Sequence, residues 1–151
     1  MKFWTQGKNE RDTRAFGERF AWRMILMFSG MALYLVSGSI FSGRPIAILA
    51  TLIALPLAYG FRLRAAAEER RRGETMEDER DTWIRAQGDR GFRIAASCWY
   101  GLLTMVLCID AARAALPAND CVLPGLILLG LIVANSVGHL TVAVLYRRDR
   151  Q

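Results

Sequence analysis

The sequence predicts an all-α, polytopic membrane protein whose four transmembrane helices form two tandem helical hairpins. Three observations lead to this fold class. The chain contains long apolar runs, its charged residues are concentrated between those runs, and one charged phrase occurs twice. Although 53% of the 151 residues are hydrophobic and 23% are charged, the two kinds of residue occupy different segments. Runs this long and apolar are typical of membrane spans and exclude an ordinary soluble domain.

Each of four apolar runs is long enough to cross a bilayer as a helix. A helix needs about 20 residues to span roughly 30 Å of hydrocarbon, and about 17 to 25 are acceptable. In lipid, the backbone can satisfy its own polar groups only as a helix or as a closed barrel. Because the runs show no alternation of period two, we expect helices and not barrel strands. We therefore expect helices over Phe20–Phe41, Pro45–Phe61, Ile94–Leu116 and Val122–Tyr146, the second being near the lower length limit.

The distribution of Lys and Arg predicts that both termini and the central loop are cytoplasmic. The N-terminal segment holds six of these residues, the segment 62–93 nine and the C-terminal tail three, whereas the two remaining turns hold one each. Basic residues are enriched in cytoplasmic loops. The net charge of +6 is thus a topology signal and suits a bilayer with anionic lipids. Since the charged segments mix both signs and carry no recognition motif, we expect no nucleic-acid partner.

The charged phrase precedes each pair of apolar runs. Its copies cover residues 9–19 and 78–90, and with the insertion 83–84 skipped, eight of eleven positions are identical. Such self-similarity predicts one membrane domain built from two repeats, 1–61 and 62–151. Because both hairpins then enter from the cytoplasm, we expect a pseudo-twofold axis along the membrane normal.

Acidic and basic residues of the two phrases form the candidate interaction site: Glu10, Arg11, Asp12, Glu79, Arg80 and Asp81. Across the expected twofold axis, Arg11 would face Asp81 and Arg80 would face Asp12. We call this pair of contacts between the two phrases an electrostatic clasp. Exposed pairs contribute only about 0–1 kcal/mol each, so a clasp fixes geometry more than it stabilises. The alternatives are docking of a cytoplasmic protein and a divalent cation held by the carboxylates. Interleaved arginines disfavour the cation, and we expect no metal or other cofactor.

The first hairpin has clear turn signals. Residues 42–44 form a tight turn, and Pro45 suits the first position of the second helix. Beyond Phe61, an Ala- and Glu-containing stretch favours continuation of that helix into the cytoplasm as far as Arg72.

A separate short cytoplasmic helix is expected in the central loop. Thr75 and Asp78 resemble a capping box that starts it, and Gly88 and Gly91 are expected to end it before the third transmembrane helix. The second hairpin then turns through 116–120. Aromatic residues near the inner helix ends are expected to anchor in the headgroup layer: Trp4, Trp22, Trp99 and Tyr146.

Asn135 and His139 are the most unusual residues within the apolar runs. They are four apart, hence on one helix face, and an intramembrane ionisable group is a functional hypothesis. The alternative is a neutral imidazole that ties helices together for about 0.6 kcal/mol. Asp110 and Arg113, three apart, are expected to form a salt bridge at the outer end of the third helix.

Small residues in the last run indicate close helix packing. Gly130, Ala134 and Gly138 recur every four positions, a spacing that brings helix backbones together in lipid. Ser97 and Gly101 are the expected matching groove, in the same subunit or in a second copy of a homo-oligomer.

Two of the three cysteines are candidate disulfide partners. Cys108 and Cys121 flank the outer turn of the second hairpin, where an oxidising compartment would allow a bridge. The alternative is that both are small buried hydrophobic residues.

The second phrase, Asp78-Glu79-Arg80-Asp81 followed by Ile84, resembles a signature of small bacterial membrane proteins that precedes a membrane helix. Arg85 and Ala86 occupy the basic and small positions that follow in that signature. The resemblance implies a small polytopic protein of the bacterial inner membrane, with some relatives encoded beside helix-turn-helix regulators. It implies no catalytic residues.

The function classes follow from these features. The chain has no zinc-protease, phosphate-loop or serine-elbow motif, so we do not expect an enzyme. We expect a non-enzymatic regulatory, accessory or scaffold protein acting through its cytoplasmic charged motifs. The alternative is a small transporter or channel with a polar path at Asn135 and His139.

Overall fold

The computed structural model describes residues 16–71 and 79–148, and all regular structure within those ranges is helical. The elements are α1 (Phe16–Leu35), the π-helical η2 (Val36–Phe41), α2 (Pro45–Arg71), α3 (Glu79–Cys108), α4 (Asp110–Ala114) and α5 (Val122–Arg148). The all-α prediction is therefore confirmed for the described chain.

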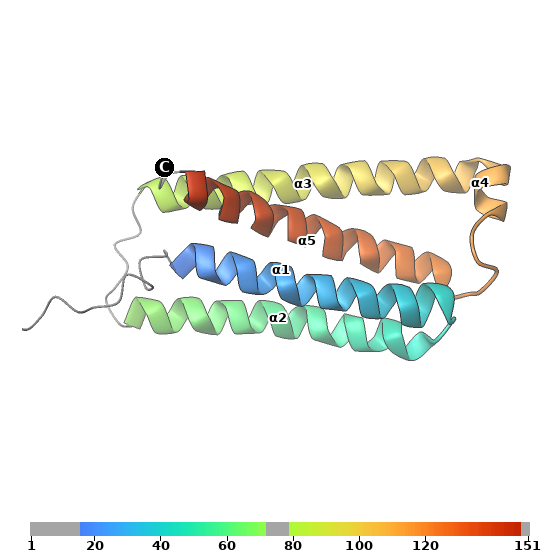
Figure 1. Ribbon diagram of the computed structural model, residues 1–151, viewed down its shortest axis with the longest axis horizontal. Coiled ribbons are helices and arrows are strands. Elements are labelled where there is room, and N and C mark those ends of the chain that lie inside the picture. Colours follow the sequence, from blue (N-terminus) through green and yellow to red (C-terminus); the bar gives the residue numbers. More distant parts are fainter. Residues whose placement is uncertain (1–15, 72–78, 149–151) are drawn as a thin grey trace, which may run out of the picture.

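Helix α5 is the centre of the molecule. It packs on α1 along one side and on α3 along the other, and α2 lies beyond α1 (Figure 1). Among the described residues α2 and α3 do not contact each other. This differs from the expected pseudo-twofold arrangement, in which the α1–α5 contact would be matched by one between α3 and α2.

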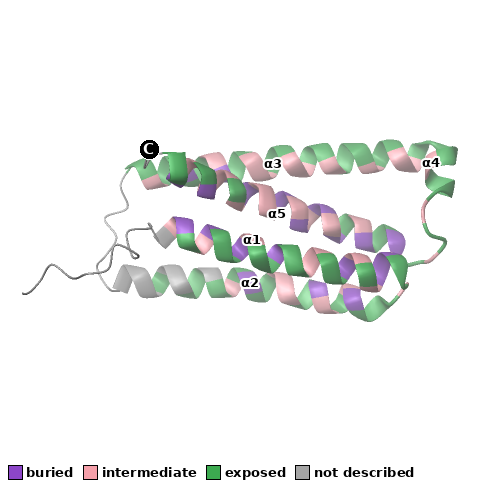
Figure 2. Cartoon of the chain, in the orientation of Figure 1, coloured by how far each residue is buried: buried purple, intermediate pink, exposed green. Residues whose placement is uncertain are grey.

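The main core lies among α1, α2 and α5. Its buried apolar side chains are Met24, Phe28, Leu35, Ala58, Leu128 and Ile132. The two buried residues of α3, Ile84 and Gly88, both lie in its first half, and Figure 2 shows many exposed residues along the whole of this helix.

The first hairpin turn follows the sequence prediction. Gly43 has a φ of 63°, a left-handed conformation that glycine adopts without strain, and α2 begins at Pro45. The continuation of the helix beyond Phe61 is also confirmed, since α2 extends to Arg71.

The prediction of a separate short helix in the central loop is wrong. Helix α3 runs without a break from Glu79 to Cys108, through both Gly88 and Gly91. A Cβ on Gly88 would lie 2.6 Å from Val142, and one on Gly91 would lie 2.8 Å from Thr141. These glycines therefore allow α3 to approach α5 closely and do not end a helix.

The third apolar run is also divided differently from the prediction. Helix α3 ends at Cys108, Ile109 is extended (φ −98°, ψ 111°), and α4 follows. The salt bridge expected in this region is present, with Arg113 Nη2 3.4 Å from Asp110 Oδ1 and both side chains exposed.

Three helical stretches within the described residues are long and apolar enough to cross a membrane: Gly17–Phe41, Glu79–Cys108 and Val122–Arg148. The apolar part of α2, Pro45–Phe61, is shorter. Its length agrees with the expectation that this run is near the lower limit for a span.

Candidate functional site

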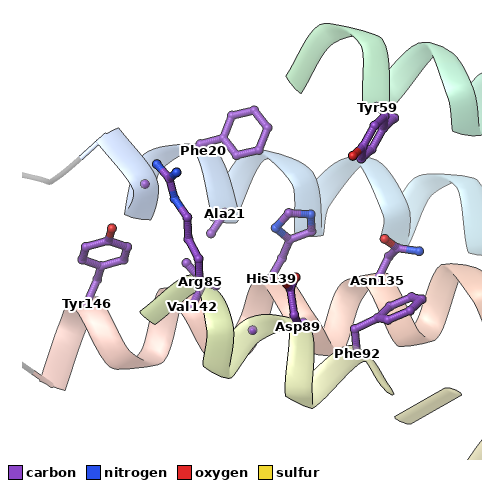
Figure 3. Close-up of a pocket in the computed structure, with 13 residues that line it drawn as sticks. Phe20, Ala21, Tyr59, Arg85, Asp89, Phe92, Asn135, His139, Val142 and Tyr146 are labelled. Carbon is purple, nitrogen blue, oxygen red and sulfur yellow. The ribbon is translucent and has the colours of Figure 1, made fainter. Parts of the chain in front are cut away.

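A cavity of about 360 Å³ lies at the end of the bundle where α1 and α3 begin and α5 ends (Figure 3). Gly17, Phe20 and Ala21 of α1 form one wall, and Tyr59 of α2 contributes an aromatic ring. Residues of α3 and α5 complete the lining. Four helices thus contribute to a single cavity near the charged end of the molecule.

Helix α3 presents both charge signs to the cavity. Arg85, Asp89 and Phe92 follow one another at spacings of four and three, which places them on one helix face. Gly88 lies between them and brings this face close to α5. The charged pair is one helical turn apart, with Arg85 nearer the start of α3.

Two polar residues of the last apolar run, Asn135 and His139, line the cavity from α5. The Nδ2 of Asn135 donates a hydrogen bond to the Leu131 carbonyl oxygen at 2.8 Å, so its Oδ1 is the group that can accept from a ligand. The imidazole of His139 stacks on Phe28, with centroids 5.8 Å apart and an interplanar angle of 22°. It also meets Phe20 in an edge arrangement at 6.1 Å.

Tyr146 closes the cavity on the side of the charged segments. It is only 7% exposed, and its hydroxyl donates a hydrogen bond of 2.8 Å to Asp81 Oδ1. Its ring lies against Gly17, where a Cβ would come within 2.8 Å of the ring atoms. Tyr146 therefore joins the start of α1 to the second charged phrase, and it is more deeply buried than the expected headgroup anchor.

The structure describes the candidate residues of the second charged phrase but not those of the first. Glu79 and Arg80 are exposed in the first turn of α3. Glu10, Arg11 and Asp12 lie outside the described residues. The clasp between the phrases stays a prediction, as does the alternative cation site.

The small residues of α5 pack on α3, as a close-packing stripe requires. Ala134 is fully buried, and a Cβ on Gly138 would lie 3.1 Å from the Gly88 carbonyl oxygen. A Cβ on Gly130 would lie 2.1 Å from the Trp99 ring. The indole Nε1 of Trp99 donates to the Leu126 carbonyl oxygen at 3.0 Å. Trp99 is thus a packing residue against α5.

The expected groove partners do not take part in this contact. Ser97 and Gly101 are exposed on α3, and a Cβ on Gly101 would meet no atom within 4 Å. The stripe meets Gly88, Phe92 and Trp99, which lie on another face of the same helix.

The candidate disulfide is not formed in this structure. Cys98, Cys108 and Cys121 are free thiols, and Cys108 is exposed, which differs from the small buried residue of the alternative. The Sγ of Cys121 lies 3.4 Å from the Gly43 carbonyl oxygen and donates to it. Cys121 thus contacts the first hairpin turn and not Cys108.

Sequence patterns alone did not identify Phe20, Tyr59, Arg85, Asp89 and Phe92 as cavity residues. One signal was present: the phrase Gly-acid-Arg occurs at 17–19 and at 88–90, and the glycine of each copy lines the cavity. No family model, curated protein or solved structure matches the chain.

Proposed function

We propose that this chain is an integral protein of the bacterial inner membrane with four spans in two hairpins and both termini in the cytoplasm. Its long apolar helices, the large exposed apolar side chains along them and the lysine and arginine bias support this arrangement. The start of α1, the end of α2, the start of α3 and the end of α5 lie together at one end of the bundle (Figure 1). The resemblance of the 78–86 phrase to a bacterial membrane-protein signature adds to the proposal.

Within that membrane, the protein acts as a non-enzymatic regulatory, accessory or scaffold protein through its charged segments. The observation that carries this proposal is the hydrogen bond from Tyr146 to Asp81. It fixes the second phrase on the end of α5, while Glu79 and Arg80 remain exposed beside it. A cytoplasmic partner that binds these two side chains therefore acts on a firmly held part of the bundle.

The test is a pull-down of the full chain in mild detergent, comparing wild type with Glu79→Lys/Arg80→Glu. Both side chains are exposed, so charge reversal introduces no buried charge, and we expect the partner proteins to be lost. The matched control is Asp110→Lys/Arg113→Glu, an exposed acid–arginine pair outside the charged end, which retains the partners. An identical set of captured proteins for wild type and the Glu79/Arg80 variant contradicts docking through this phrase.

A second function, transport through a polar path, is favoured by one observation: the cavity reaches both Asn135 and His139. If the protein transports a solute along this path, proteoliposomes that contain it show a solute flux. We expect His139→Ala to lower that flux severalfold without changing the helix content. Flux at the wild-type rate in that variant removes His139 from the path.

A further inference from the structure

We propose that the cavity at the charged end binds a zwitterion that carries an ammonium and a phosphate group, of the phosphoethanolamine type. Such a ligand has two sources, the headgroup of phosphatidylethanolamine or the free compound. This inference goes beyond the proposed function, because binding requires neither a docked protein nor transport.

The part of the cavity lined by Tyr59 and Asp89, both of which are exposed, has the chemistry of an ammonium site. Phe20, Tyr59 and Phe92 contribute aromatic rings from three different helices. Ring faces attract cations by about 0.5–1 kcal/mol when exposed and by about 2 kcal/mol when desolvated. Asp89 adds a carboxylate, and Asn135 adds the Oδ1 that its bond to Leu131 leaves available as an acceptor.

The part of the cavity beside Arg85 has the chemistry of a phosphate site. Arg85 lies one helical turn before Asp89, about 6 Å nearer the start of α3. In Figure 3 its side chain extends across the cavity from α3 toward the first turn of α1. A guanidinium presents several donors in a plane and binds phosphate oxygens in pairs.

Ligands with one charge fit this lining less well. A simple anion would bring its charge near the Asp89 carboxylate, and a simple cation would meet the Arg85 guanidinium. A zwitterion orients both of its charges favourably at once. The cavity volume of about 360 Å³ is at the small end of the 300–1,000 Å³ typical of ligand pockets, which suits a headgroup-sized molecule.

The experiment uses the full chain in mild detergent with equal amounts of dioleoyl phosphatidylethanolamine and dioleoyl phosphatidylglycerol, and native mass spectrometry measures the lipid retained. Both lipids carry the phosphate, but phosphatidylglycerol lacks the ammonium. Calorimetric titration with free phosphoethanolamine tests the soluble source. The variants are Asp89→Asn and Arg85→Gln, and Asp110→Asn/Arg113→Gln is the matched control. Circular dichroism confirms the helix content of each variant.

We expect wild type to retain phosphatidylethanolamine about tenfold better than phosphatidylglycerol, the effect of one charge-assisted contact. Asp89→Asn abolishes this preference, Arg85→Gln weakens retention of both lipids, and the control behaves as wild type. If only the free compound binds, and Asp89→Asn weakens that binding about tenfold, the ligand is soluble and the site stands. Equal retention of the two lipids without binding of the free compound overturns the proposal. The proposal is also overturned if Asp89→Asn leaves the binding of phosphatidylethanolamine or of free phosphoethanolamine unchanged.

Discussion

At the scale of single residues, glycines on the contact faces determine how closely the helices approach α5. Gly130 accommodates the Trp99 ring, Gly17 the Tyr146 ring, and Gly88 the side chain of Val142. Large aromatic side chains need a surface without a Cβ when two backbones approach this closely. The glycines therefore act through the space that they leave, and not through an unusual backbone conformation.

Replacing Gly130 with alanine is predicted to destabilise the contact between α3 and α5. The new Cβ would lie 2.1 Å from Trp99, so the indole must move and its hydrogen bond to Leu126 is lost. Overpacking of this kind costs about 1–3 kcal/mol. Thermal unfolding in detergent, followed by circular dichroism, measures the loss.

The matched control is Gly101→Ala on α3, where the added methyl group meets no atom within 4 Å. Alanine also favours helix over glycine by about 1 kcal/mol, so this variant is neutral or more stable. Equal melting temperatures for the two variants would mean that Trp99 does not pack on Gly130.

Residue-scale prediction from the sequence succeeded where a periodic pattern carries the information. The four-residue spacing of Asn135 and His139 correctly placed both on one face, and both line the cavity. Tyr146 and Trp99 were expected to be interfacial anchors, yet both hydrogen-bond within the bundle. Their roles depend on which side chain lies opposite, which a single sequence does not reveal.

At the scale of elements, hydrogen bonds join η2 to the loop before α5, at the end of the bundle opposite the cavity. The Nδ2 of Asn119 donates to the Ile40 carbonyl oxygen at 3.0 Å, and its Oδ1 accepts from the Cys121 N–H at 3.0 Å. The Ser39 hydroxyl in η2 donates to the Cys121 carbonyl oxygen at 3.1 Å. The π-helical end of the first hairpin is thereby fixed to the start of α5.

Asn119→Ala is expected to loosen this outer connection, because it leaves the Ile40 carbonyl and the Cys121 N–H without their side-chain partner. The expected cost is about 1–3 kcal/mol. Faster alkylation of Cys121 by a maleimide, with Cys98 and Cys108 changed to serine, measures the loosening directly. Asp120→Ala is the control, since Asp120 is the exposed neighbour. Identical alkylation rates for the two variants contradict the role given to Asn119.

Element boundaries were predictable where turn chemistry is local. Gly43 and Pro45 determine the first turn within a few residues, and the Ala- and Glu-containing stretch extends α2 as expected. The break at Ile109 and the continuity of α3 through Gly88 were not predictable in the same way. Glycine in a helix costs about 1 kcal/mol, and the close contacts of Gly88 and Gly91 with α5 become visible only in the folded structure.

At the scale of the whole molecule, the charged helix ends, the cavity and the Tyr146–Asp81 hydrogen bond all lie at one end of the bundle (Figures 1 and 3). Helices α1 and α3 both begin at the end of the bundle where α5 ends, and each packs on α5, but among the described residues they do not contact each other. The two repeats that the charged phrase indicates stay a prediction. The central position of α5 depends on which apolar faces pair, and apolar sequences do not encode that choice as a local pattern.

The topology of the charged end is the central claim, and cysteine labelling tests it most directly. In a background with Cys98, Cys108 and Cys121 changed to serine, Thr82→Cys and Ala118→Cys each introduce one exposed thiol, at opposite ends of the bundle. A membrane-impermeant maleimide applied to right-side-out spheroplasts is predicted to label Ala118→Cys, and Thr82→Cys only after the membrane is permeabilised. Labelling of Thr82→Cys in the intact spheroplasts would place the charged end and its cavity outside the cell, in direct contradiction.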